Sequence, residues 1–540
     1  MTSLPKIEVT SRQFLLGTAC LYLIVFNFPF MAHSYRAAFE TANTSVTFLI
    51  ALPMLLLAIL YLTFSLTLWG RAAKPMLGLV SLASLAVLYG ELSFGVVFDN
   101  DMVRNVFETD FSEARSYLSL SSVSFLTVSS AIIIAALAVF DIQFLPLSQE
   151  IRSRVTSNAL LAVIAVLLTY SCYGEFAATA RNNNVLKREL VPFEWFDSTL
   201  DYWAARLWNT NHHFTLIDSE PHLADSGSVK AHATIVIVGE TARADHFEYD
   251  GYPRNTNQHT KPYEVVYIQD VHSCGTSTAI SVPCMFSDQT QEQFVPSEAK
   301  HRQNALDIAS LATVEVIWID NNSGCKGVCD RVNHERFNPK TAGPLCDGNY
   351  CLDEILVARL KEELPSQPNA EKIIVLHEIG SHGPTYFRRY PEKQKVFAPD
   401  CRRSDIQNCS QEELVNAYDN TIVYTDWVNA GVLQVLEEAK ATTDATVLYV
   451  SDHGESLGEN GLYLHGMPYF LAPESQTHVP MWIWQTGANG WRECIRQNSD
   501  HMVMSHDIVF HTILDAAHVE SGALKPKQSL LTGCVTHSSS

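Results

Sequence analysis

The chain has 540 residues, of which 47% are hydrophobic and only 18% are charged, and its mean hydropathy is +0.02. A single domain rarely exceeds about 250 residues, so the length predicts at least two domains. The aromatic content of 10% and the scarcity of charge blocks exclude a disordered chain. The net charge of −21 excludes nucleic acid as a partner, because the chain has no basic run that could bind phosphate groups.

The first third of the chain contains five apolar segments of at least 20 residues, each long enough to cross a bilayer as a helix. The predicted spans are residues 13–35, 46–69, 75–98, 120–140 and 155–174. A cleaved signal peptide is the alternative for the first segment. Its apolar stretch is longer than a signal core and four more spans follow, so a membrane span is favoured.

Basic residues mark one side of the predicted membrane domain. The loops on this side contain Lys6, Arg12, Arg71, Lys74, Arg152 and Arg154 and are almost free of acidic residues. The positive-inside rule therefore predicts that the N-terminus lies in the cytoplasm and that everything after residue 175 lies outside.

Ten of the 12 cysteines follow residue 270. An even, clustered set on the predicted outer side indicates five disulfides in an oxidising compartment, although spacing alone leaves the pairing open. No two cysteines have the CxxC spacing of a zinc site.

Three regions follow from these patterns: a five-helix membrane domain (1–176), an interfacial linker (177–230) and an outer domain (231–540). Within the linker, residues 191–208 combine tryptophans with acidic residues. This pattern predicts either a helix in the lipid interface or a connector helix packed on the outer domain.

The outer domain contains four short β-branched runs at residues 233–240, 314–322, 372–380 and 446–454, separated by helix-sized segments. Uniformly apolar runs of this kind predict buried strands of a mostly parallel sheet with helices on both faces, an α/β fold. Ligands bind at the carboxyl ends of the strands in such folds.

Carboxylates and imidazoles follow three of these strands. Glu240 follows the first strand, His382 follows the third, and Asp452 and His453 follow the fourth, with His465 a little further on. Each residue alone is more often a helix cap or an ordinary polar side chain. Together they favour a metal site, and carboxylate plus imidazole is the donor set that Zn²⁺ accepts.

A second histidine pattern resembles a zinc protease motif but does not match it. His377 and His382 lie five residues apart, follow a strand and enclose Gly380, whereas the protease requires histidines at i and i+4 on a helix. The protease mechanism is therefore excluded.

Residues 273–287 (SCGTSTAISVPCMFS) read as a turn of small residues leading into a helix, with Cys274 and Cys284 expected to form a bridge. A hydroxyl at a helix N-terminus lies beside backbone N–H groups that favour a phosphate. Thr276, Ser277 and Thr278 are all candidate nucleophiles by spacing, and an ordinary helix cap is the alternative.

These motifs, with SDHGESLGENG (451–461) and LHGMP (464–468), resemble the phosphoethanolamine transferases, which include the lipid A enzymes of the EptA type and the mobile colistin-resistance enzymes. The resemblance runs from the first span to about residue 495. It implies an alkaline-phosphatase/sulfatase α/β fold for the outer domain. The cysteine-containing segment 320–332 resembles the EptA type more than the mobile enzymes.

The resemblance implies a role for individual residues. It places the catalytic nucleophile on Thr278 and the zinc ligands on Glu240, Thr278, Asp452 and His453. The substrate-phosphate or second-metal residues that it implies are His382, His465, Lys326 and Ser323, and the ethanolamine contacts are Asn105, Thr109 and Glu113.

The implied activity is a zinc-dependent transfer of phosphoethanolamine, with one or two zinc ions, from phosphatidylethanolamine to a lipid A phosphate. It would proceed through a threonine intermediate and confer resistance to polymyxin. The expected protein is a monomer of the bacterial inner membrane with its catalytic domain in the periplasm. The alternatives are another core or glycan acceptor, a sulfatase or phosphodiesterase of the same fold, or a catalytically silent sensor. The chain lacks the C/S-x-P-x-R motif of the main sulfatase class.

Overall fold

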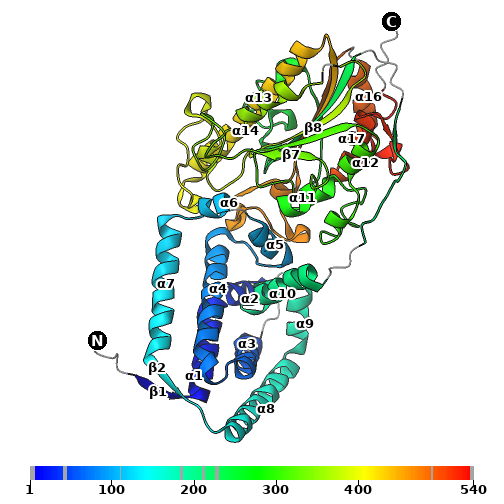
Figure 1. Ribbon diagram of the computed structural model, residues 1–540. Coiled ribbons are helices and arrows are strands. Elements are labelled where there is room, and N and C mark those ends of the chain that lie inside the picture. Colours follow the sequence, from blue (N-terminus) through cyan, green and yellow to red (C-terminus); the bar gives the residue numbers. More distant parts are fainter. Residues whose placement is uncertain are drawn as a thin grey trace. The chain divides into compact units, whose positions relative to one another are not determined.

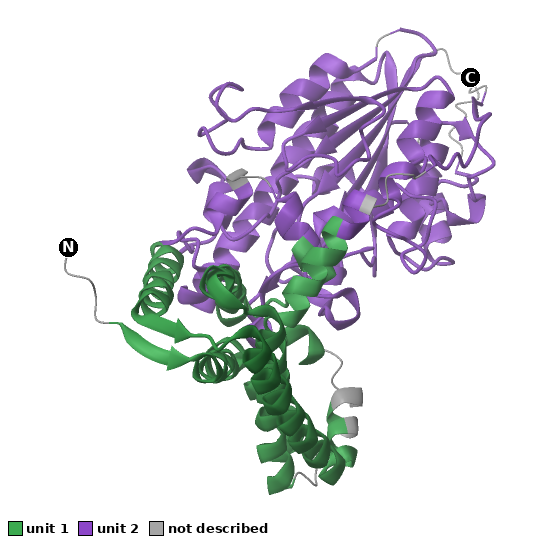
Figure 2. Ribbon diagram, turned by 60° about the horizontal axis from the view of Figure 1, so that its bottom comes forward, with its two compact units in different colours: residues 1–103, 120–203 green, residues 104–119, 204–540 purple. Residues whose placement is uncertain are grey.

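The computed structural model describes residues 6–40, 45–109, 111–182, 186–208, 213–224, 230–365, 367–487 and 490–534. The chain forms two compact units: residues 1–103 with 120–203, and residues 104–119 with 204–540 (Figure 2). Segment 104–119, which connects the third and fourth predicted spans, therefore packs with the C-terminal unit. The domain borders at residues 176 and 230 stay a prediction.

Four of the predicted spans are unbroken apolar helices of membrane-crossing length among the described residues. They are Val46–Thr67, Gly70–Phe94, Leu120–Val139 and Leu147–Ser171, and their regular helices are α3 (Val46–Thr67), α4 (Ala73–Phe94), α7 (Leu120–Val139) and α8 (Leu147–Ser171). The other elements of this unit include α9 (Tyr173–Asn182), α10 (Phe193–Trp208) and the parallel pair β1 (Ile7–Thr10) and β2 (Phe140–Gln143). The prediction of a multi-pass helical region is confirmed.

The first predicted span, 13–35, contains a bend that its hydropathy does not predict. Helices α1 (Ser11–Leu21) and α2 (Phe28–Glu40) are joined by one π-helical turn, and the two arms meet at 64°. Pro29 lacks the N–H that would continue the helical ladder. At the bend, the Asn27 side-chain amide donates to the carbonyl oxygens of Tyr22 (3.0 Å) and Val191 (2.7 Å). Counting this bent pair as one span, the unit has up to five spans.

The C-terminal unit is built on a seven-stranded sheet with the order β5-β12-β9-β4-β8-β6-β7. Its strands are β4 (Ala231–Gly239), β5 (Val266–Ile268), β6 (Glu315–Asp320), β7 (Asn333–Arg336), β8 (Glu371–His377), β9 (Thr443–Ser451) and β12 (Met481–Gln485). Only β12 pairs antiparallel with its neighbours β5 and β9. Every residue of β4 is buried, as its mainly apolar sequence predicts.

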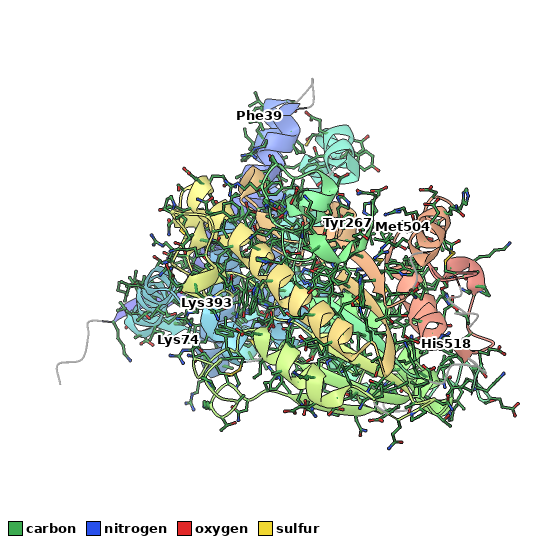
Figure 3. The ribbon with its side chains drawn as sticks, turned by 90° about the horizontal axis from the view of Figure 1, so that it is seen from above. Phe39, Lys74, Tyr267, Lys393, Met504 and His518 are labelled. Carbon is green, nitrogen blue, oxygen red and sulfur yellow. A yellow bond between two sulfur atoms is a disulfide. The ribbon has the colours of Figure 1, made fainter. Side chains whose placement is uncertain are left out.

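Helices cover both faces of this sheet. Figure 1 shows α13 and α14 on one side and α12, α16 and α17 on the other, and the side chains of these layers are drawn in Figure 3, where Tyr267 marks the edge strand β5. The helices are α11 (Thr278–Met285), α12 (Ala305–Leu311), α13 (Glu354–Glu363), α14 (Gln411–Ala439), α15 (Glu474–Thr477), α16 (Gly490–Ser499) and α17 (Val509–Ala516). The predicted α/β fold with a mostly parallel sheet is confirmed.

The segment that joins spans three and four contributes two helices, α5 (Asn100–Glu108) and α6 (Phe111–Ser116). Two short antiparallel pairs complete the C-terminal unit: β10 (Ser456–Leu457) with β11 (Tyr463–Leu464), and β3 (His222–Leu223) with β13 (Val519–Glu520).

Five disulfides join cysteines that neighbour one another in sequence: Cys274–Cys284, Cys325–Cys329, Cys346–Cys351, Cys401–Cys409 and Cys494–Cys534. Cys20 and Cys172 stay free. The expectation of five bridges is confirmed, and the structure gives the pairing that the spacing left open.

The length of the closed loop predicts how much each bridge stabilises the C-terminal unit. Cys494–Cys534 spans 40 residues and Cys325–Cys329 only four. Replacing both cysteines by serine should lower the free energy of unfolding by about 4 kcal/mol for the long loop and about 2 kcal/mol for the short one. Denaturant unfolding of the purified protein in detergent measures both changes. A larger loss from the short loop would contradict this explanation.

Candidate active site

The carboxyl ends of β4 and β9 bring two acidic residues together. The strands are parallel, and Gly239 pairs in register with Ser451, so the next residues, Glu240 and Asp452, leave the sheet at the same level. The Asp452 N–H donates to the Gly239 carbonyl (2.9 Å), which fixes the loop behind the strand. Both carboxylates are fully buried.

His453 completes a set of three metal-ligating side chains. Its Nε2 lies 3.5 Å from both Glu240 Oε1 and Asp452 Oδ2, and one ligand atom from each residue lies within 4.8 Å of the others. The Nδ1–H donates to the Gly454 carbonyl (2.9 Å), so Nε2 faces the carboxylates with its lone pair. Burial lowers the pKa of His453 to about 4 despite the Asp452 charge, so the ring is a neutral ligand at pH 7.

The chemistry of this set fits a divalent cation. Asp452 Oδ2 is buried and has no hydrogen-bond partner within the described part of the chain. Burial, followed by the Asp452 charge, raises the pKa of Glu240 well above its usual value. Two adjacent buried carboxylates repel each other, and a cation between them removes that cost. Two oxygens and one imidazole nitrogen are a donor set that suits Zn²⁺.

Thr278 lies directly against these three residues. It is the first residue of α11. Its hydroxyl donates to Glu240 Oε2 (3.1 Å) and lies 3.4 Å from His453 Nε2. A fourth oxygen thus faces the same small volume, at a helix N-terminus whose N–H groups favour an incoming phosphate.

The other two candidate hydroxyls of this turn are directed elsewhere. Thr276 donates to the Met467 carbonyl (2.6 Å). Ser277 precedes α11 with an extended backbone, and its Oγ has no hydrogen-bond partner among the residues described. Of the three hydroxyls, that of Thr278 is the one with contacts to Glu240 and His453.

A second group of polar residues borders the first. The rings of His453 and His465 have centroids 4.4 Å apart, and those of His465 and His382 lie 5.6 Å apart. Glu455 Oε2 accepts from His465 Nδ1 (2.7 Å). His382 donates from Nδ1 to the Gly383 carbonyl (2.7 Å) and from Nε2 to Glu113 Oε1 (3.2 Å). The imidazoles expected from sequence are therefore brought together with the metal-ligating set.

His382 and Glu113 form a buried ion pair. Both ring nitrogens of His382 face acceptors, so both carry hydrogen. Burial opposes the charge on His382, but the Glu113 carboxylate outweighs it and raises the pKa of the imidazole to about 9. Burial likewise opposes the charge on Glu113, and His382 lowers its pKa to about 2. A positive charge is thus held beside His465, whose ring lies against that of His453, at neutral pH.

Lys326 adds a second cation nearby. Its Nζ lies 3.3 Å from the Ser323 carbonyl and 3.4 Å from the Glu108 carbonyl, and its charge also helps to lower the pKa of Glu113. The Ser323 N–H donates to Asn322 Oδ1 (2.7 Å). The structure therefore places Lys326 and Ser323 beside the group that contains Glu113.

The three residues expected to touch ethanolamine differ in position. Glu113 lies in the site, against His382. Thr109 closes the end of α5 by donating its hydroxyl to the Asn105 carbonyl (2.6 Å), one residue beyond the Glu108 carbonyl that faces Lys326. Asn105 and Thr109 are thus on the same segment as Glu113, and their described hydrogen bonds stay within that segment.

A cavity of about 420 Å³ opens beside the ion pair. It is lined by Glu113, Asn321, Asn322, Ser323, Arg336, Phe337, Asn338, Pro339, Asn349, Tyr350, Cys351, Ile379, His382 and Arg389. Its lining combines three cationic side chains with amides and two aromatic rings, so the cavity suits a phosphorylated, hydroxyl-rich ligand.

Sequence reasoning missed two side chains that support the site. Asn322 donates to Glu240 Oε2 (2.7 Å) and to the Glu378 carbonyl (2.9 Å). Glu455, within the SDHGES motif, holds His465 and accepts from Tyr386 (2.6 Å). Asn322 lies two residues after β6, so the rule that strand ends carry the site would have found it.

His377, the first histidine of the protease-like pattern, has a structural partner. Its Nδ1 donates to Asp320 Oδ2 (2.8 Å), and both residues are buried. His382 faces Glu113 instead. The two histidines do not share a metal-ligating group within the described structure.

Two family models match the chain. The model described as Sulfatase matches residues 232–519, and the model described as Phosphoethanolamine transferase EptA/EptB matches residues 56–207. The first covers the α/β unit and its strand-end residues, and the second covers most of the helical region.

Full-length relatives agree with these matches. The chain is 34% identical to phosphoethanolamine transferase EptA of Escherichia coli K12 over 96% of each protein. It is 30% identical to phosphatidylethanolamine transferase Mcr-1 of Escherichia coli, over 93% of this chain and 97% of that protein. The structure of the integral membrane lipooligosaccharide phosphoethanolamine transferase A (EptA) of Neisseria meningitidis superposes with a TM-score of 0.93 at 31% identity, covering 98% of this chain and 99% of that one. The resemblance inferred from the sequence is confirmed: the chain belongs to the EptA-type phosphoethanolamine transferase family.

Proposed function

We propose that the protein transfers phosphoethanolamine from phosphatidylethanolamine to a lipid A phosphate through a covalent intermediate on Thr278. The observation that carries this proposal is the position of the Thr278 hydroxyl, 3.1 Å from Glu240 and 3.4 Å from His453 at a helix N-terminus. A solved relative is named for transfer to lipooligosaccharide, which supports a glycolipid acceptor.

Glu240, Asp452, His453 and Thr278 would hold one zinc ion, and His382 with His465 would contact the substrate phosphate or a second zinc ion. When bound, zinc supplies Lewis-acid chemistry, because it lowers the pKa of a coordinated hydroxyl and neutralises charge on a phosphate.

In the first half-reaction, Thr278 Oγ forms a bond to the phosphorus of phosphatidylethanolamine, and the bond from phosphorus to the diacylglycerol oxygen breaks. The Thr278 proton leaves along its hydrogen bond to Glu240. The departing diacylglycerol oxygen needs a proton, and His382, whose pKa is about 9, carries one at neutral pH. Lys326, Ser323 and His465 position the phosphate oxygens on which negative charge grows.

Segment 104–119 is proposed to select the donor head group. Glu113 stays ionised at neutral pH because its pKa is about 2, so it offers negative charge to the ethanolamine ammonium. Asn105 and Thr109, on the same segment, would contact the head group with it.

In the second half-reaction, a lipid A phosphate oxygen bonds to the same phosphorus, and the bond from phosphorus to Thr278 Oγ breaks. Thr278 regains its proton from Glu240, and His382 regains one from the acceptor phosphate or from water. The two half-reactions give ping-pong kinetics. The product phosphate carries an added ammonium group, so the lipid surface attracts polymyxin and other cationic peptides less strongly. Resistance to such peptides follows from this charge change.

The proposed location is the bacterial inner membrane, with the catalytic unit in the periplasm as a monomer. The five disulfides support an oxidising compartment. The helical spans tether the catalytic unit to the membrane that contains the lipid substrates, which raises their effective concentration.

Mass spectrometry of lipid A tests the reaction and its acceptor. Cells that express the gene should contain lipid A heavier by one or more phosphoethanolamine groups. Thr278→Ala should lower this modification by at least about three orders of magnitude, because the nucleophile is lost. Ser277→Ala is the matched control, since its hydroxyl has no described partner, and it should stay within a few-fold of wild type. Modified core sugar with unmodified lipid A would identify the alternative acceptor and overturn the lipid A assignment.

Removal of metal tests the zinc requirement. Incubation of the purified protein with a strong chelator should abolish transfer, and added Zn²⁺ should restore it, because Glu240 and Asp452 repel each other without a cation. Mg²⁺ should restore little activity, since it disfavours imidazole ligands. Full activity in protein shown to be free of metal would contradict the proposal.

The His382–Glu113 pair predicts the alkaline side of the pH–rate profile. Activity should fall as the pH rises through about 9, where His382 loses its proton. In Glu113→Gln, burial of the imidazole is no longer offset by a carboxylate, so the pKa of His382 falls. The alkaline limb should therefore move to lower pH by at least about one unit.

Glu520→Gln is the control for this measurement, because Glu520 pairs with a histidine, His222, on the exposed strands β3 and β13. Its pH–rate profile should match that of the wild type. If the alkaline limb of the pH–rate profile is unchanged in Glu113→Gln, His382 is not the proton donor.

A further inference from the structure

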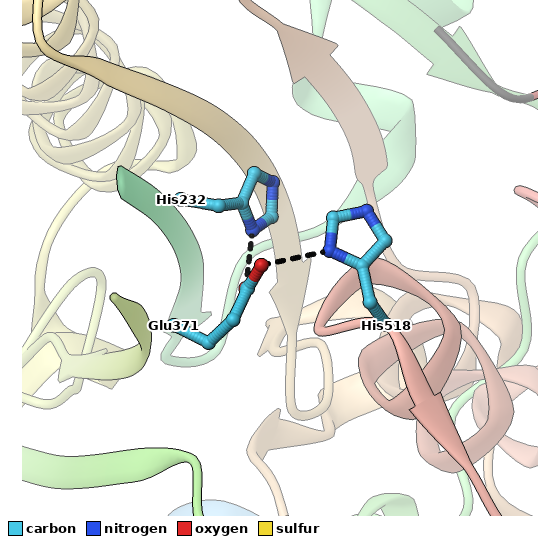
Figure 4. Close-up of side chains that lie close together, drawn as sticks. All are labelled: His232, Glu371 and His518. Carbon is cyan, nitrogen blue, oxygen red and sulfur yellow. Dashed lines mark hydrogen bonds and ion pairs between the residues drawn. The ribbon is translucent and has the colours of Figure 1, made fainter. Parts of the chain in front are cut away.

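A second cluster of side chains that can ligate a metal lies at the amino ends of the parallel strands, whereas the active site lies at their carboxyl ends. His232 is the second residue of β4 and Glu371 is the first residue of β8, and the two are paired in register on neighbouring parallel strands. His518 comes from the turn that follows α17 (Figure 3). Figure 4 shows both imidazoles directed at the Glu371 carboxylate.

The geometry of this cluster is compact. His232 Nδ1 lies 3.0 Å from Glu371 Oε2, and His518 Nδ1 lies 3.1 Å from Glu371 Oε1. One ligand atom from each residue lies within 4.8 Å of the others. In a tetrahedral zinc site, metal–ligand bonds of about 2.0–2.1 Å place neighbouring ligand atoms about 3.3 Å apart, so small side-chain movements admit the ion.

We propose that His232, Glu371 and His518 form a second transition-metal site that binds Zn²⁺ and fastens the C-terminal segment to the start of the sheet. The side chains of His232 and Glu371 are each 11% exposed, whereas that of His518 is 39% exposed. Solvent therefore reaches the cluster from the His518 side, which gives the ion an entry path and a water molecule as fourth ligand.

Two supporting features hold the ligands in place. His232 Nε2 lies 3.3 Å from Thr446 Oγ1 on β9, which orients the ring with Nδ1 towards Glu371. The Glu371 carboxylate accepts from both rings, one at each oxygen, which holds it between His232 and His518.

The backbone at His518 supports a role for its side chain. His518 has φ = 52°, in the left-handed region where glycine or asparagine is favoured. A residue with a Cβ costs roughly 1–2 kcal/mol there. The Ala224 N–H donates to the His518 carbonyl (2.8 Å), and the next two residues pair with β3. A metal at this turn would link β4, β8 and the β3–β13 pair, which are distant in sequence.

A hydrogen-bonded triad without metal is the competing explanation for the same three residues. It requires only that Glu371 accept one proton from each ring, as the distances allow. Metal binding by the purified protein distinguishes the two explanations. The site is also separable from the active centre, because Glu240 follows His232 by eight positions along β4, about 26 Å of extended strand.

The test uses the full chain in detergent, with Asp452→Asn and His453→Ala removing two active-site ligands. Titration of this background with Zn²⁺ by calorimetry should show one equivalent bound, and its thermal unfolding midpoint should rise with the metal. Adding His518→Asn, which tolerates the left-handed backbone, should weaken this binding at least tenfold and abolish the rise in the midpoint. Glu371→Gln should do the same.

His222→Asn is the matched control, because His222 lies on the adjacent strand β3 and pairs only with Glu520 in the described structure. It should leave the binding unchanged. Co²⁺ bound to the background protein should give the visible absorption of a tetrahedral site, lost in His518→Asn. The proposal would be overturned if His518→Asn and Glu371→Gln left the zinc affinity and the thermal unfolding midpoint unchanged. It would also be overturned if the folded background protein bound no zinc.

Discussion

The active site depends on the repulsion between two buried carboxylates, those of Glu240 and Asp452. Glu240 and Asp452 leave neighbouring parallel strands at the same level, and each is fully buried. The cost of placing two negative charges side by side in a medium of low dielectric constant is too large to leave without compensation. His453 Nε2 lies 3.5 Å from both carboxylates, and Asp452 Oδ2 has no hydrogen-bond partner among the described residues, so the group suits a cation that would offset this cost.

The surrounding elements are arranged around that constraint. Helix α11 presents the Thr278 hydroxyl to the same carboxylate, and its N-terminus supplies N–H groups for a phosphate. Segment 104–119 belongs to the C-terminal unit, and it contributes Glu113, which keeps His382 protonated. The large negative charge of the chain therefore coexists with a local positive field, because His382 and Lys326 lie within the roughly 8–10 Å over which charges act in salt solution.

Much of this arrangement could be predicted from sequence. The apolar runs predict the spans and the buried strands, and the strand-end rule predicts Glu240 and the Asp452–His453 pair. The bend in span 13–35 was missed because hydropathy ignores the broken helical ladder ahead of Pro29. The ligand cluster of His518 was missed because its three members lie on separate elements, so only the paired register of β4 and β8 and the turn after α17 bring them together.

Peptide mass spectrometry can detect the phosphoethanolamine group on Thr278 during the reaction. Purified protein incubated with phosphatidylethanolamine, without acceptor, should contain a peptide spanning residues 273–287 that carries one phosphoethanolamine group, with fragment ions that assign it to Thr278. The adduct should disappear when acceptor lipid is added. An adduct on Thr276 or Ser277 would contradict the assignment of Thr278 as nucleophile. Product formation with no adduct in rapidly quenched samples would contradict a covalent intermediate.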